Sequence, residues 1–262
     1  MLYFVIPFKS RRVAKDWARA CDLLQSTLRS VCSQTCHQFR VLVVCHEKPT
    51  FDVDPSIVRF VESPFEPPCL EGDVNITPWE RFQRLSGDKG RKLLWGLGVA
   101  REEAAKFTMF VDADDLVSRR ICEFVHASNH PYGWVVVNGY RMDESSSWVA
   151  FRRKRFNHEC GTSHILRTTC APFPENIETA LADGGYFVER YDVHAYIADD
   201  MGKRGTPLGA IPFYGAIYRF NSEAMYSGSF RRKDGVAQIL ARYALKGRVV
   251  TKWFRREFGF ER

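Results

Sequence analysis

The sequence lacks three features that define special structural classes. It contains no apolar run long enough to cross a bilayer as a helix, which argues against an integral membrane protein. It contains no internal repeat or low-complexity segment, which argues against a repeat architecture. Its first residues lack the basic start and the longer apolar stretch of a signal peptide, so we expect a cytoplasmic protein.

Paired metal-binding cysteines are also missing. The eight cysteines are scattered along the chain, and none forms a Cys-x-x-Cys pair. The nearest approach to a zinc motif is Cys32, Cys36 and His37, which lacks a second ligand pair at zinc-finger spacing. In a chain of this size without a signal peptide, buried free thiols are the favoured interpretation.

The chain is long enough for one α/β domain with a sizeable core, since 45% of its 262 residues are hydrophobic. Its net charge of +7 is localised, because residues 231–262 hold ten Lys or Arg and three acidic residues. Residues 1–230 therefore carry no net charge. We accordingly divide the chain into a domain of residues 1–230 and a basic amphipathic tail of residues 231–262.

Strands and helices are predicted to alternate. Apolar residues recur at helical spacing from Asp16 onward and again from Lys89 onward. The apolar or β-branched runs that we predict as strands are residues 2–8, 40–45, 57–61, 107–111 and 134–138. The proline-rich stretch from Ser63 to Ser86 is predicted to be a long loop. The alternation favours a Rossmann-like α/β domain, with helices on both faces of a mainly parallel sheet and ligands beyond the carboxyl ends of the strands.

Three carboxylates follow the predicted strand 107–111, at Asp112, Asp114 and Asp115. Like charges this close repel each other unless a hard divalent cation lies among them, so we expect Mn²⁺ or Mg²⁺ at Asp112 and Asp114. Such an ion can also neutralise the charge that develops on a departing diphosphate. The alternative is that Asp114 or Asp115 caps the next helix, and for Asp115 we favour a cap.

The motifs around this cluster follow an ordered pattern. In chain order they are Val5-Ile6-Pro7, residues 24–35, residues 39–45, residues 88–92 and residues 110–115. This order resembles the opening of family 2-like glycosyltransferases of the GT-A fold. The resemblance covers about residues 1–140, a nucleotide-binding half, and implies that residues 141–230 form an acceptor half.

The resemblance assigns a donor site. It makes Asp112, Ala113 and Asp114 a DxD-type segment that holds the metal and the diphosphate of a nucleotide sugar. It places Pro7, after the first strand, and Glu47, after the second, near the base and ribose.

Two further segments complete this donor site. Asp88, Lys89 and Lys92 would approach the nucleotide from the start of a helix, where free backbone N–H groups favour phosphate. The alternative is that this basic segment is a solvated helix face. Residues 160–164 resemble a segment that borders the donor sugar, and the candidates there are Thr162, Ser163 and His164.

Transfer with inversion requires a base that removes the proton of the acceptor hydroxyl. In the family an acidic residue at the start of a later helix serves as this base, and Asp192 is the corresponding choice. The sequence departs from the family motif, because Tyr191 stands where an acid is expected. His194 is the second candidate, as a base or an additional metal ligand. The alternative is that Asp192 is an N-cap and His194 an ordinary helix residue.

The basic tail has two interpretations. Residues 235–262 interleave aromatic and aliphatic residues with Lys and Arg, and such a helix can lie on an anionic membrane surface. It would then bring the enzyme to a lipid-linked acceptor at the inner membrane surface. Packing of the tail on the domain is the interpretation that we favour.

We therefore predict a hexosyltransferase-type glycosyltransferase in glycan or polysaccharide synthesis. Its donor would be a nucleoside-diphosphate sugar, with a UDP-sugar favoured, and its partner a glycan or lipid-linked hydroxyl acceptor. One alternative is a haloacid-dehalogenase-like phosphatase that uses Asp112 and Asp114, with Asp199 and Asp200 as its later metal pair. The other is a nucleic-acid-binding protein acting through the tail, although no nucleic acid is expected as partner.

Overall fold

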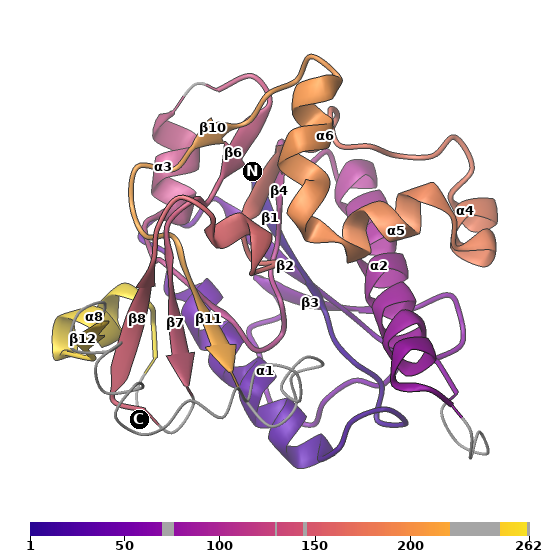
Figure 1. Cartoon of the computed structure of the whole chain (residues 1–262), viewed down its shortest axis with the longest axis horizontal. Helices are drawn as coiled ribbons and strands as arrows, with labels where there is room; N and C mark the ends of the chain where they lie inside the picture. The colour runs from indigo at the N-terminus through magenta and orange to yellow at the C-terminus, as the bar shows by residue number, and fades with distance from the viewer. Residues whose placement is uncertain (70–75, 129, 144–145, 221–246, 261–262) are drawn as a thin grey trace.

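The structure is a computed structural model that describes residues 1–69, 76–128, 130–143, 146–220 and 247–260, with Asp192 described in its backbone only. Two sheets and the helices around them make up the described chain (Figure 1). The strands are β1 (Leu2–Pro7), β2 (Phe39–Cys45), β3 (Val58–Glu62), β4 (Phe107–Phe110), β5 (Leu116–Val117), β6 (Gly133–Val135), β7 (Gly139–Asp143), β8 (Trp148–Arg152), β9 (His164–Arg167), β10 (Gly209–Ala210), β11 (Ala216–Phe220) and β12 (Gly247–Val249). The helices are α1 (Trp17–Cys32), α2 (Pro78–Glu102), α3 (Ile121–Ala127), η1 (Phe156–His158), α4 (Ile177–Asp183), α5 (Tyr186–Asp192), η2 (His194–Tyr196), α6 (Ile197–Lys203) and α8 (Lys252–Glu257).

The large sheet has the strand order β10-β6-β9-β4-β1-β2-β3. Strand β1 lies between β4 and β2 and is parallel to both, and β2 is parallel to β3. Strand β9 runs antiparallel between β4 and β6. The α/β fold class and the mainly parallel sheet predicted from the sequence are therefore confirmed for the large sheet.

Both faces of the large sheet are covered by helices, as predicted. Successive residues of a strand point to opposite faces. In β1, Phe4 and Ile6 pack with α1 and α3, whereas Tyr3 and Val5 pack with α2, α5 and α6. In Figure 1, α2 and α5 lie side by side on one side of the sheet, away from α1 and α3. A strand buried on both faces accounts for the continuous apolar run of residues 2–8.

The second sheet has the order β12-β8-β7-β11-β5, and its pairs are antiparallel except for β7 with β11. It carries its own hydrophobic core, which includes Leu116, Ile217 and two aromatic residues at the end of the chain, Phe254 and Phe258. Strand β12 thus forms one edge of this sheet, and helix α8 packs against it (Figure 1). Residues 221–246 lie outside the described part of the chain, so the predicted domain boundary at residue 230 stays a prediction.

Helix α2 begins eleven residues before Lys89, so the loop predicted from Ser63 to Ser86 is too long. The helix starts at Pro78 because Thr77 caps it: the Thr77 hydroxyl accepts the Glu80 N–H, and the Glu80 carboxylate accepts the Thr77 N–H. Proline at the first helical position suits this start, because its fixed φ matches the helix. The capping box outweighs the weak apolar periodicity of residues 78–88.

The position of Asp192 also differs from the prediction. It was expected at the start of a helix, but it is the last residue of α5, and the short η2 and α6 follow it. Gly184, with φ of +71°, ends α4 in the left-handed conformation that glycine adopts readily, and Gly185 then begins α5. The two glycines therefore start a helix earlier than the sequence pattern indicated.

None of the helices in the described ranges is both long enough and apolar enough to span a membrane.

Candidate active site

The acidic turn lies directly beyond the carboxyl end of β4. Its first residue, Asp112, donates its backbone N–H to the Thr162 hydroxyl at 2.9 Å. The turn closes where the Asp115 N–H donates to the Asp112 carbonyl at 3.1 Å. From helix α1, the Thr27 hydroxyl donates to the Ala113 carbonyl at 3.0 Å. The backbone of the turn is thus fixed from two sides.

Asp115 has a role that the sequence did not predict. It is fully buried and accepts hydrogen bonds from the Thr162 hydroxyl at 2.6 Å, the Cys160 thiol at 3.1 Å and the Arg219 backbone N–H at 3.1 Å. Burial, together with Asp114 and Asp112, raises its pKa to about 8. The predicted helix cap is wrong, because β5 follows Asp115 and the α3 N-cap position, Arg120, makes no side-chain cap.

Arg219 on β11 is a site residue that sequence reasoning missed. Its buried guanidinium donates from Nε to the Asp114 carbonyl and reaches α1, at the Leu23 carbonyl (3.2 Å) and the Ser26 hydroxyl (2.9 Å). The group therefore fixes the acidic turn against the helix. The signal in the sequence was an arginine within the otherwise apolar run of residues 216–220.

The polar end of the first helix holds the segment after the acidic turn. The Ser30 hydroxyl donates to the Val117 carbonyl at 3.1 Å and accepts the Val117 N–H at 2.9 Å. The Gln34 side chain donates to the Ser118 carbonyl at 3.1 Å and accepts the Cys122 N–H at 2.8 Å. These side chains do not line the cavity, so the segment 24–35 noted in the sequence supports the site from outside.

A cavity of about 210 Å³ opens beside the acidic turn. Most of the side chains predicted to bind a nucleotide sugar line it, together with one of the two candidate bases, His194. The predicted residues that line it are Pro7, Asp88, Lys89, Lys92, Asp112, Ala113, Asp114 and His194. Glu47 does not line the cavity. Its carboxylate accepts hydrogen bonds from the Ser10 hydroxyl at 2.8 Å and the Arg11 N–H at 3.1 Å.

Lys89 joins helix α2 to the acidic turn. Its ammonium lies 2.5 Å from Oδ1 of Asp112. Burial opposes the positive charge, but Asp112, Asp114 and Asp115 outweigh it and raise the pKa of Lys89. The side chain is thus a fixed cation beside two carboxylates, and it is not the solvated helix face considered from the sequence.

Asp88 and Lys92 form a second ion pair one turn apart on α2. Lys92 Nζ lies 2.6 Å from Oδ2 of Asp88, and His46 Nε2 lies 3.0 Å from Oδ1 of the same carboxylate. Lys92 is only 1% exposed. Burial, opposed by Asp88, lowers the pKa of Lys92. Both oxygens of Asp88 are engaged by the protein, so Asp88 holds the ammonium of Lys92, which lines the cavity, and the imidazole of His46, which does not.

His194 approaches Lys89 because α5 packs very closely on α2. A Cβ at Gly90 would lie 2.3 Å from the Val188 carbonyl oxygen, so only glycine permits this approach. The Nε2 atom of His194 is buried and has no hydrogen-bond partner among the residues that the structure describes. Burial, then the charge of Lys89, lowers the pKa of His194 to about 3. The imidazole is therefore neutral. The side chain of Asp192 lies outside the described part of the structure.

The segment 160–164 contributes to the site differently from the prediction. Thr162 bridges Asp112 and Asp115, as described above, whereas Ser163 and His164 are fully buried and bond to each other at 3.0 Å. Burial lowers the pKa of His164 to about 3. Gly161 lines the cavity, and a Cβ there would lie 2.8 Å from Oδ2 of Asp112. The glycine thus leaves room for the Asp112 carboxylate.

Several lining residues were not chosen as candidates from the sequence. They come from five separated segments, and only Gly161 among them belongs to a segment placed at the donor site there. They are Phe8, Lys9, Val13, Lys15, Ala20, Leu23, Arg81, Leu85, Ser86, Glu159, Gly161 and Tyr218. The cavity wall thus has an apolar part beside β1 and α1, and basic side chains near the carboxylates.

The phosphatase alternative requires Asp199 and Asp200 beside Asp112, and the structure separates them. Asp200 pairs with Arg204 at 3.1 Å and with Arg190 at 3.4 Å. Neither Asp199 nor Asp200 lines the described cavity. The geometry therefore gives no support to a phosphatase site.

Comparison with family models and with curated proteins finds no match. Among solved structures, a fragment of S. aureus TarS in complex with UDP-GlcNAc matches with a TM-score of 0.50 and 13% identity. The match covers 87% of this chain and 61% of the TarS chain, so this chain spans less than two thirds of that protein's length.

Two weaker matches are to a protein assigned as a nucleotide-diphospho-sugar transferase in Desulfovibrio desulfuricans and to mannose-1-phosphate geranyltransferase of Thermus thermophilus. The first has a TM-score of 0.39, 10% identity and coverage of 92% of both chains. The second has a TM-score of 0.36 and 14% identity, and covers 83% of this chain and 73% of its own. The TarS likeness shows that the chain shares that fold.

Proposed function

We propose that the chain is a metal-dependent glycosyltransferase. It would move a sugar from a nucleoside-diphosphate donor, with a UDP-sugar favoured, to a hydroxyl group of a glycan or lipid-linked acceptor. The observation that carries the proposal is the cavity beyond β4, where Asp112, Asp114 and Lys89 meet. Support for the donor comes from the shared fold, because TarS was solved in complex with UDP-GlcNAc.

The donor atoms of the acidic turn fit a hard divalent cation. Asp112 and Asp114 offer carboxylate oxygens at the cavity, which Mn²⁺ and Mg²⁺ prefer as ligands. Asp115 is excluded as a ligand, since its oxygens are buried and already bonded to the protein. Gly161 leaves space beside Oδ2 of Asp112. Asp112 and Asp114 would therefore hold the ion, which would supply positive charge for the leaving diphosphate.

The lysines at the cavity suit a diphosphate group. Lys89 is positively charged and held beside Asp112, and Lys92 lies one turn along the same helix. A phosphate oxygen can replace Asp112 as the partner of Lys89, because an ammonium group binds phosphate as a point charge. Pro7 and the apolar side chains of Phe8 and Leu23 would then border the base. The family 2 assignment rests on the sequence resemblance alone.

His194 is the base that the geometry favours. It lies at the cavity next to Lys89, is neutral, and its Nε2 has no hydrogen-bond partner within the described part of the chain, so it would be able to accept the proton of an acceptor hydroxyl. A diphosphate that neutralises Lys89 would remove one cause of the low pKa of His194 and make it a stronger base. Asp192 is kept as the alternative base. Inversion follows from the resemblance.

Donor binding tests the proposal most directly. The melting temperature of the purified chain would be measured with UDP-, GDP- and dTDP-sugars, with and without Mn²⁺. We expect one donor class to raise it only when Mn²⁺ is present, because a ligand that binds the folded state alone stabilises that state. Asp112→Asn should abolish this shift and slow donor turnover at least about 100-fold, the usual scale for losing one preorganised charge contact.

Asp199→Asn is the matched control, because it makes the same carboxylate-to-amide change at a residue of helix α6 that does not line the cavity. It should leave the donor shift unchanged. If no nucleotide sugar shifts the melting temperature in a metal-dependent way and Asp112→Asn has no effect, the proposal is wrong. A trapped phospho-aspartate on Asp112 would instead establish the phosphatase alternative.

A further inference from the structure

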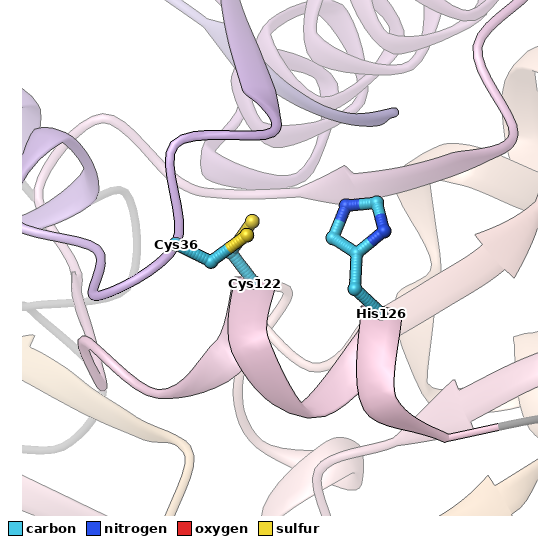
Figure 2. Close-up of side chains that lie close together, drawn as sticks. All are labelled: Cys36, Cys122 and His126. Carbon is cyan, nitrogen blue, oxygen red and sulfur yellow. The ribbon is translucent and has the colours of Figure 1, made fainter.

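A second cluster of metal-ligand side chains lies away from the acidic cavity. Cys36, Cys122 and His126 each offer one ligand atom, and these atoms all lie within 4.8 Å of one another. Figure 2 shows Cys36 on the loop between α1 and β2, with its sulfur beside that of Cys122, and the imidazole of His126 on the next turn of the same helix. None of the three residues lines the cavity beside Asp112.

The spacing of the residues accounts for their convergence. Cys122 and His126 are four residues apart on α3, so their side chains lie on one face of the helix. Cys36 belongs to a loop that is fastened to the start of α3: Thr35 donates its N–H to the Arg119 carbonyl at 2.9 Å and its hydroxyl to Glu123 at 2.7 Å. These hydrogen bonds position the loop that carries the Cys36 thiol, and they do not require a bound metal.

The ligand orientation is also prepared by backbone groups. His126 Nε2 lies 3.0 Å from the Gln38 carbonyl oxygen, which fixes the position of the imidazole. An ion bound through Nδ1 would keep this contact, and one bound through Nε2 would replace it. Burial, then Cys36, raises the pKa of the Cys122 thiol, whereas the Gln38 N–H opposes this rise. Cys122 is fully buried and the other two residues are half-buried, so an ion has a route to the cluster from solvent.

Two thiols and one imidazole define the class of ion. Sulfur and nitrogen ligands suit Zn²⁺, whereas Mg²⁺ and Mn²⁺ prefer oxygen. Two thiolates would also balance the charge of Zn²⁺ in a half-buried place. Tetrahedral zinc, with bonds of about 2.3 Å to sulfur and about 2.0 Å to nitrogen, sets its ligand atoms roughly 3.5–4 Å apart. The observed spacing therefore needs shifts of about an ångström or less.

We propose that Cys36, Cys122 and His126 form a zinc site that ties the loop before β2 to helix α3. Water or a small anion takes the fourth position. The site is independent of the proposed transferase activity, since it contains no residue of the acidic cavity. Both thiols lose their protons when the ion binds, so two protons are released for each Zn²⁺ bound.

Metal titration of the whole chain tests the site. The protein would be stripped of metal with a chelator under reducing conditions and titrated with Zn²⁺ against a chromophoric competitor, and separately with Co²⁺. We expect one Zn²⁺ per chain and thiolate-to-Co²⁺ charge-transfer absorption. Cys36→Ser and His126→Gln should each weaken Zn²⁺ binding at least about 100-fold, because even the loss of an outer-shell partner costs about 10–100-fold.

The controls come from the motif that the sequence alone suggested. Cys32→Ser and His37→Gln change a thiol and an imidazole flanking Cys36, neither of which belongs to the cluster. Both variants should bind Zn²⁺ as the unmodified chain does. Equal losses in these controls and in Cys36→Ser would overturn the assignment, and so would the absence of stoichiometric Zn²⁺ binding by the unmodified chain.

Melting temperatures show whether the variants fold, and alkylation shows whether the two thiols are reduced. Zn²⁺ should raise the melting temperature of the stripped chain but not that of Cys36→Ser, whose metal-free melting temperature should equal that of the stripped chain. Cys36 carries this test because it is less buried than Cys122. Alkylation and mass analysis of protein isolated without reductant should find both thiols reduced. A Cys36–Cys122 disulfide there would overturn the zinc site.

Discussion

The two edges of the large sheet carry clusters of opposite chemistry. At the carboxyl edge, Asp112, Asp114 and Lys89 place oxygen ligands and fixed charge around an open cavity. At the amino edge, next to the Gln38 carbonyl that receives the Leu2 N–H, thiols and an imidazole gather in a tight cluster of one buried and two half-buried residues. The difference teaches that the groups at the carboxyl edge face an open cavity, as the proposed donor site requires, whereas those at the amino edge face one another, as the proposed zinc site requires.

Helix α1 links the two edges. Along its length, Thr27 and Ser30 fasten the acidic turn and the strand after it. Beyond its last turn, Gln34 and Thr35 fasten the start of α3, where the thiol cluster lies. The same helix therefore positions a reactive site and a structural one through hydrogen bonds to backbone groups.

The largest expected effect concerns the proposed base at the carboxyl edge. His194→Gln should lower transfer to an acceptor by about 100- to 10,000-fold, the range of general base catalysis, while donor binding stays intact. The measurement is acceptor-dependent turnover with the donor class found by thermal shift. Asp192→Asn is the comparison variant. If it abolishes turnover and His194→Gln does not, Asp192 is the base.

The second prediction separates neighbouring carboxylates within the acidic turn. Asp115→Ala leaves three buried donors without their acceptor and should lower the free energy of unfolding by at least about 1–3 kcal/mol. Asp114→Ala, at the cavity, should change it by less than about 0.5 kcal/mol and instead abolish the metal-dependent donor shift. Urea unfolding of both variants checks this. Equal destabilisation would mean that Asp114 is structural as well.

The third prediction concerns pH. The folded-state pKa of Asp115 is about 8, above its ordinary value of 3.8. Between about pH 4 and pH 8 the folded state therefore keeps a proton that the unfolded state has released. The free energy of unfolding falls as pH rises through this range. For His164 and His194 the folded-state pKa is about 3 against 6.5, so their contribution falls as pH drops from 6.5 towards 3.

Only the Asp115 effect operates between pH 6.5 and 8 among these three groups. The melting temperature of metal-free protein should therefore fall across this window. Asp115→Asn, which cannot titrate, should show a flatter profile. An identical slope in both proteins would contradict the raised pKa of Asp115.

The smallest expected effect tests the independence of the two edges. Cys36→Ser should leave the Mn²⁺-dependent midpoint of donor binding unchanged, because sites without shared contacts behave additively. Donor titration with and without Zn²⁺ provides the measurement. A large change in the donor midpoint would show that the thiol cluster affects donor binding at the cavity. The two sites would then not be independent.

Several parts of the site could be predicted from the sequence. The apolar run before Asp112 predicts a buried strand, and carboxylates directly after such a strand reach the carboxyl edge of the sheet. Lys89 was placed at the nucleotide site by its position in the motif order, and it does line the cavity. The strand, the place of the carboxylates and the position of Lys89 at the cavity could be predicted because strand position and motif order are properties of short, continuous segments. That these residues bind a nucleotide stays a prediction.

Other parts escaped prediction because they depend on contacts between distant segments. The helix cap assigned to Asp115 failed because its partners are Thr162 and Arg219, far along the chain. Around Cys36 the sequence offered only Cys32 and His37, and buried free thiols were favoured over a zinc motif. Cys122 approaches Cys36 only after the loop docks on α3.

The sequence by itself determined the alternation of strands and helices and the placement of an acidic turn after a buried strand, since apolar periodicity is local. Only the tertiary structure decided which groups around that turn are open to a ligand and which are buried. The Gln34 side chain meets Cys122 across 88 positions of sequence, and Arg219 meets Asp115 across 104. The physical reason is that burial and hydrogen-bond partners belong to the packed molecule and not to any one segment.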